Sequence, residues 1–122
     1  MLLDSNVIIY SAQPDHAELR RFIAENVPAV SAVSIVEVIG YHRLAEGDRH
    51  YFEEFFAVAE VLPITPVILD QAVRLRQARK MGLGDAIVAA TALVHRRTLV
   101  TRNTKDFDHI AGLALHDPFS AG

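Results

Sequence analysis

The chain has 122 residues, of which 51% are hydrophobic and 22% charged, and its 12 Lys and Arg against 15 Asp and Glu give a formal charge of −3. This length fits one domain with a single core, and the apolar fraction excludes a disordered chain. Without cysteine, the chain has no disulfide, no thiolate metal site and no cysteine nucleophile.

The first half of the chain alternates short apolar runs with amphipathic segments. It opens on Met1-Leu2-Leu3, with neither a basic start nor a long apolar region, so we expect no signal peptide. Helical spacing of apolar residues and β-branched runs distinguish the elements. We expect a strand over 1–4, a helix over 16–25, a strand over 27–33 and helices over 34–44 and 51–59.

The second half continues this alternation. Pro63 places a third strand, over 61–64, near a sheet edge. Residues 85–95 are almost uncharged and rich in alanine, and a helix that is apolar all round is typical of a buried position. The remaining elements are a helix over 66–80, a strand over 98–101, a helical turn over 104–110 and a strand over 113–115.

Short apolar strands that alternate with helices predict a parallel sheet covered on both faces. We therefore expect one domain over residues 1–122, a three-layer α/β/α sandwich with a mainly parallel five-stranded sheet. The uncharged stretches are far shorter than the roughly 18–20 residues of a membrane span. The expected location is the cytoplasm.

Four acids follow or precede the predicted strands at the sheet edge where ligands bind in such folds. Asp4 ends the first strand, Glu37 lies on the helix after the second, Asp85 opens the buried helix, and Asp106 follows the fourth strand. Since the carboxyl ends of parallel strands share one edge, the four side chains are expected to lie close together.

Each acid also has a local explanation. Ser34-Ile35-Val36-Glu37 has the spacing of a capping box, in which Glu37 bonds back to the Ser34 amide. Asp85 and Asp4 could each cap a helix, and Asp106 could be a first-turn acid after a Thr104 cap. Taken singly, each explanation is at least as good as a functional one.

Together the four acids indicate a metal site. Carboxylates packed at one edge repel each other unless a cation offsets their charge. A set of oxygen ligands without His or Cys suits Mg²⁺ or Mn²⁺, which keep several waters and complete their shell with a substrate phosphate. The predicted chemistry is metal-dependent hydrolysis of a phosphodiester by water.

Four blocks of the chain resemble, in the same order, those of the PIN-domain ribonucleases. They are Leu2–Tyr10, Ser31–Gly40, Gly84–Leu93 and Leu99–Phe107, and together they span nearly the whole chain. A chain of this length without an additional domain is most similar to the VapC-type toxins of bacterial and archaeal toxin–antitoxin pairs.

The resemblance implies an endoribonuclease that uses Mg²⁺ or Mn²⁺. It makes Asp4, Glu37 and Asp85 catalytic, metal-binding acids. Members of the family differ over whether the Asn103 or the Asp106 position carries the fourth acid; because Asn103 is neutral, we favour Asp106 as catalytic and metal-binding. The residues expected to orient these acids, or water near them, are Ser5, Asn6, Thr101 and Asn103.

Partners follow from the same resemblance: an RNA substrate, a second copy of the chain and a small VapB-like antitoxin whose tail would occlude the acids. Two basic clusters, residues 74–80 and 96–105, are either solvated surface or phosphate contacts beside the acids. Arg102 and Lys105 flank the acidic edge and are the best candidates for RNA phosphate contacts.

Other functions fit less well. An aspartyl-nucleophile phosphatase normally has a second Asp two residues after the first, where this chain has Asn6, and a receiver domain has adjacent acids, where it has Ser5. The stronger alternative is a catalytically inactive PIN-like domain that binds RNA or protein. Such a domain would be expected to have lost an acid, and here Asp4, Glu37 and Asp85 are all present.

Overall fold

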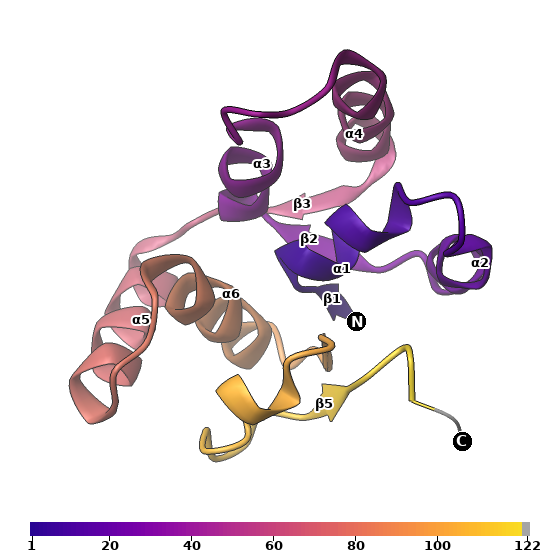
Figure 1. Cartoon of the computed structure of the whole chain (residues 1–122). Helices are drawn as coiled ribbons and strands as arrows, with labels where there is room; N and C mark the ends of the chain where they lie inside the picture. Colours follow the sequence, from indigo (N-terminus) through magenta and orange to yellow (C-terminus); the bar gives the residue numbers. More distant parts are fainter. Residues whose placement is uncertain (121–122) are drawn as a thin grey trace.

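A computed structural model describes residues 1–120 of the chain, with a five-stranded sheet at its centre (Figure 1). The strand order is β3-β2-β1-β4-β5, and all four neighbouring pairs run parallel. The strands are β1 (Leu2–Leu3), β2 (Ala29–Ser31), β3 (Glu60–Leu62), β4 (Leu99–Val100) and β5 (Leu115–His116). The predicted α/β class, the five parallel strands and the edge position of the third strand are confirmed.

Helices cover both faces of this sheet. They are α1 (Ser5–Ser11), α2 (Ala17–Asn26), α3 (Ala32–Ile39), α4 (Glu46–Val58), α5 (Pro66–Ala78) and α6 (Leu83–Val94), with a short 3₁₀ helix at Thr104–Asp106. Figure 1 shows α1 to α4 gathered on one side and α5 beside α6 on the other. Within residues 1–120, no helix is both long and apolar enough to cross a membrane.

Alternation along the strands divides the core between the two faces. Leu2 and Leu99 pack with α6 and with Phe107, whereas Leu3 and Val100 pack with residues of α1 to α4. Successive side chains of a strand point to opposite faces, so each two-residue strand contributes to both cores. The three inner strands, β1, β2 and β4, are buried on both faces, as the apolar runs predict.

Helix α6 is buried as its composition predicts. Its small residues allow α5 to pack closely, with Ile68 and Ala72 of α5 against Ala86 and Ala90 of α6. All seven side chains from Ala86 to Ala92 are buried. This helix therefore packs on the face of the sheet that α5 also covers.

The structure corrects the sequence prediction twice in the first third of the chain: it adds helix α1 and ends the second strand earlier. Helix α1 was not expected, because Val7, Ile8 and Ile9 are β-branched and favour strands by propensity. Burial of Val7, Ile8 and Ser11 against the sheet outweighs that preference. The second strand ends at Ser31 rather than residue 33, because the Ser31 side chain caps α3 by accepting a hydrogen bond from Val33 N at 3.2 Å.

Candidate active site

The order in which the chain adds strands to the sheet reverses between β1 and β4, and polar side chains meet at this point. From β1 the chain continues to β2 and β3 on one side, then crosses to β4 on the other. In open parallel sheets this point forms a crevice at the carboxyl ends of the strands. Asp4 follows β1 and Thr101 follows β4, and Thr101 Oγ1 donates to Asp4 Oδ2 at 2.8 Å across the crevice.

Asp4 is a buried carboxyl group whose surroundings disfavour its charge. Its side chain does not cap α1, and the residue is 4% exposed. Burial, followed by the charges of Asp85 and Glu37, raises the pKa of Asp4 to about 6, although the hydrogen bond from Thr101 and the Ser5 amide act in the opposite direction. Asp4 is the N-cap residue of α1 by position, as the sequence allowed, but its side chain makes no capping hydrogen bond.

Glu37 reaches the same crevice from the middle of α3. The predicted capping box is wrong, because Ser31 and not Ser34 caps the helix. Glu37 consequently lies almost two turns into α3, and its exposed side chain approaches α1, where its Oε1 is 2.7 Å from Ser5 Oγ. Ser5 is thus placed to orient the Glu37 carboxylate.

Asp85 lies in the first turn of α6 but does not cap it. The capping position is Gly82, so the N-cap explanation of Asp85 is wrong. Burial raises the pKa of Asp85, and the charges of Glu37 and Asp106 raise it further. Electrostatic effects therefore link Asp4 to Asp85 and Glu37, and Asp85 to Glu37 and Asp106.

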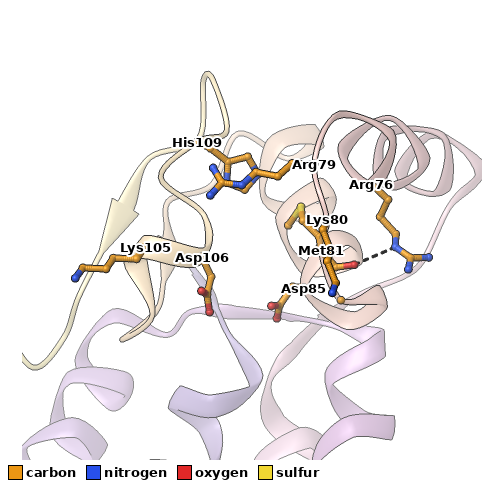
Figure 2. A pocket seen from close by; sticks show the side chains of 9 residues that line it. Arg76, Arg79, Lys80, Met81, Asp85, Lys105, Asp106 and His109 are labelled. Carbon is orange, nitrogen blue, oxygen red and sulfur yellow. Dashed lines mark hydrogen bonds between the residues drawn. The ribbon is translucent and has the colours of Figure 1, made fainter.

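Asp106 is the last residue of the 3₁₀ helix. The residue in the capping position of this helix is Asn103, not Thr104 as the sequence suggested. Asp106 and Asp85 line a cavity of about 460 Å³. Figure 2 shows their carboxylates facing the same space from two different segments. Asn103 donates its backbone N–H to Thr101 Oγ1 at 3.0 Å, which connects this loop to the hydroxyl that binds Asp4.

The basic residues match the sequence expectation in part. Lys105 lines the cavity, as do Arg79 and Lys80 at the end of α5 (Figure 2). Within residues 1–120 none of these three forms an ion pair, whereas Arg74 and Arg97 pair with acids elsewhere. The Arg102 guanidinium lies outside the cavity, 4.6 Å from the centre of the Phe119 ring and 5.3 Å from that of Tyr10.

Two residues of the site have no functional role in the sequence interpretation, which treats Ser34 only as a helix cap. Ser34 is fully buried, and its Oγ lies 2.8 Å from Ser5 Oγ. A side-chain carbon added to Gly84 would overlap the Glu37 carboxylate. A glycine next to a candidate acid inside a helix was a usable signal, but nothing in the spacing of the chain pairs Ser34 with Ser5. Asn6, by contrast, is exposed.

The acids fit a hydrated hard cation. Within residues 1–120 no three His, Asp or Glu side chains converge closely enough to hold a metal ion by themselves. Mg²⁺ takes one or two carboxylates directly and retains several waters, so it does not need three converging ligands. Burial and, less strongly, the charges of Asp85 and Glu37 raise the pKa of Asp4, a cost that a cation would offset, and all the donors are oxygen atoms.

Known proteins share this architecture and sequence. The PIN domain family matches residues 1–113. The VapC ribonuclease Y4jK of Sinorhizobium fredii is 31% identical, with 98% of this chain and 97% of the relative aligned, and ribonuclease VapC10 of Mycobacterium tuberculosis is 34% identical over 88% and 85%. A chain from a toxin–antitoxin complex of Klebsiella pneumoniae is 31% identical with a TM-score of 0.76 and 98% of both chains covered. The chain therefore belongs to the PIN domain family, in its VapC group.

Proposed function

We propose that this chain is an Mg²⁺- or Mn²⁺-dependent endoribonuclease, acting as a single nuclease domain over residues 1–122 and as the toxin of a toxin–antitoxin pair in the cytoplasm. One observation carries the proposal. Asp4, Glu37 and Asp85 come from three distant segments, yet the charges of Asp85 and Glu37 add to the effect of burial in raising the pKa of Asp4 to about 6. The kinship with VapC ribonucleases supports RNA as the substrate.

Asp4, Glu37 and Asp85 would hold the cation, with Asp106 beside them as the fourth acid. When bound, Mg²⁺ or Mn²⁺ neutralises charge on the phosphodiester and lowers the pKa of water. Thr101 and Ser5 fix the carboxylates of Asp4 and Glu37. Hydrolysis then consists of attack by a water oxygen on phosphorus and departure of one ester oxygen, with the acids orienting the water.

Removal of the metal tests the proposal. We expect wild-type protein to cleave single-stranded RNA with Mn²⁺ or Mg²⁺ and to lose this activity in EDTA, because the clustered carboxylates repel the phosphate without a cation. Mn²⁺ at 100 times its Kd should stabilise the fold by about 2.7 kcal/mol, measured by thermal unfolding. The control is a buffer in which Na⁺ replaces the divalent cation at equal ionic strength. If Mn²⁺ supports neither cleavage nor a higher Tm, the chain is not a metal-dependent nuclease.

Three of the cations that line the cavity, Arg79, Lys80 and Lys105, are proposed to hold RNA phosphates. Replacing Lys105 or Arg79 by alanine should weaken RNA binding and reduce the slope of log K against log salt by about 0.7 for each lost contact. RNA binding is best measured in an Asp85→Asn background, by fluorescence anisotropy over a salt series. Arg21→Ala, which removes an exposed cation on α2, is the matched control. An unchanged slope in both cavity variants would place the RNA backbone elsewhere, with Arg102 the next candidate.

The partners are proposed from the relatives and from two apolar hollows. A hollow of about 500 Å³ lined by Ile9, Tyr41 and Leu44 extends to Glu37, so an antitoxin segment lying in it would cover that acid. A second hollow, lined by Leu69, Val73 and Leu83, exposes apolar side chains on α5 and α6. A second copy of the chain would remove this surface from water.

A further inference from the structure

Glu37 has the longest side chain of the four acids and is exposed, so other residues must restrict it if it is to occupy one position. A glutamate has three rotatable side-chain bonds, and an exposed one samples many rotamers. In this structure its Oε1 lies 2.7 Å from Ser5 Oγ, and its carboxylate passes over Gly84 of α6. Two separate contacts therefore act on the carboxylate, one from α1 and one from α6.

The first contact extends to Ser34. Ser5 Oγ is 2.8 Å from Ser34 Oγ as well as 2.7 Å from Glu37 Oε1. A serine hydroxyl carries one hydrogen and an ionised carboxylate only accepts. The Ser5 hydrogen is therefore donated to Glu37, and Ser34 must donate its own hydrogen to Ser5 Oγ. Ser34 is fully buried and no water competes for it, so it fixes the rotation of the Ser5 hydroxyl.

The second contact requires the absence of a side chain. A Cβ on Gly84 would overlap Glu37 Oε2 and come within 2.6 Å of Glu37 Cδ. The backbone around Gly84 is ordinary α-helix, where alanine would normally be favoured over glycine. Glycine at this position consequently leaves room for the Glu37 carboxylate beside the first turn of α6.

We propose that Ser34 and Gly84 are positioning residues for Glu37: Ser34 acts through the Ser5 hydroxyl, and Gly84 provides the space in which the carboxylate lies. The proposal rests on the proposed function only for its catalytic consequence, since the position of Glu37 can be measured without metal or RNA. Neither residue would touch the metal or the substrate.

The direct test is the order of the Glu37 side chain in metal-free protein. NMR of glutamate-labelled protein, assigned with Glu37→Gln, should give two distinct γ-proton shifts for a fixed Glu37 and averaged shifts for a mobile one. We expect distinct shifts in wild type and in Ser34→Thr, which keeps the hydroxyl. Ser34→Ala and Gly84→Ala should average or displace them.

Matched controls separate positioning from general destabilisation. Ser11→Ala removes another fully buried serine hydroxyl, and Gly47→Ala adds a methyl where nothing lies within 4 Å; neither should change the Glu37 signals. Averaged shifts in wild type, or unchanged shifts in both Ser34→Ala and Gly84→Ala, would overturn the proposal. Because Gly84→Ala leaves every hydroxyl in place, it tests the idea even if Ser34→Ala folds poorly.

Metal affinity provides the functional readout. Loss of a group that orients a ligand lowers metal affinity or activity by about 10- to 100-fold. Ser34→Ala and Gly84→Ala should therefore bind Mn²⁺ about 10-fold more weakly in calorimetry, with Ser34→Thr close to wild type. A wild type with a fixed Glu37 that neither binds Mn²⁺ nor cleaves RNA would refute the proposed function and leave the positioning of Glu37 intact.

Discussion

Replacing Asp4 by asparagine is expected to stabilise the metal-free protein at pH 7 while abolishing cleavage of RNA. The pKa of Asp4 is about 6 in the folded state against 3.8 for the ordinary group. Between these values the folded protein binds the proton more tightly than the unfolded chain, so stability falls as the pH rises from about 4 to 6. Above pH 6 the full loss, about 3 kcal/mol, applies. Asparagine has no charge and avoids it.

The measurement is the difference in unfolding free energy between Asp4→Asn and wild type in EDTA, at pH values from 4 to 8. It should be close to zero at pH 4 and should grow toward about 3 kcal/mol at pH 7. Asp15→Asn, an exposed aspartate far from the crevice, should give a difference that is small at every pH. A difference for Asp4→Asn that does not depend on pH would contradict the raised pKa.

Mn²⁺ should reverse the order of stability of the two proteins. A cation that binds only the folded wild type stabilises it, whereas Asp4→Asn has lost a ligand and gains little. The variant should therefore unfold at the higher temperature in EDTA and at the lower temperature in saturating Mn²⁺. Such a reversal of the two unfolding temperatures would show that the Asp4 charge destabilises the metal-free fold and stabilises the fold that holds a cation.

The sequence predicted the elements whose pattern matches their burial. Leu2-Leu3, Leu99-Val100 and the alanine-rich helix α6 are apolar because both of their sides are covered, and local pattern reports such burial directly. Helix α1 was missed because seven residues with a β-branched run carry a strand signal, and only packing against the sheet decides for helix. Boundaries near Ser31 were misjudged because two serines competed as the cap.

The sequence predicted the acids and placed Ser5 and Thr101 among the residues that orient them, but it assigned no such role to Ser34 or Gly84. Asp4, Glu37 and Asp85 each follow or precede an element whose type is readable from the chain, so topology brings them together. The contacts that hold them join residues far apart in sequence: Thr101 to Asp4, Ser34 to Ser5, and Gly84 beside Glu37. No periodicity records such pairs, and Ser34 was instead interpreted as a cap because its spacing from Glu37 fits that local motif.

Asp85→Asn and Asp106→Asn are expected to separate a metal-holding acid from one that acts mainly through its charge. Loss of a supporting group costs 10- to 100-fold, so loss of Asp85 should lower kcat/KM for RNA by more than about 100-fold. Asp106→Asn should leave measurable cleavage. It should also lower the pKa of Asp85, because the charge of Asp106 is one of its causes, and so move the acid limb of the rate–pH profile to lower pH.

The contrast between these two variants decides the role of the fourth acid. Asp108→Asn, which removes an exposed carboxylate two residues from Asp106, should leave both the rate and its pH dependence unchanged. If Asp106→Asn is as inactive as Asp85→Asn, Asp106 holds the cation directly. If it neither slows cleavage nor moves the acid limb, its carboxylate is too far from Asp85 to matter. The intermediate result follows from the structure because Asp106 is exposed and faces Asp85 across an open cavity, where water screens its charge without removing it.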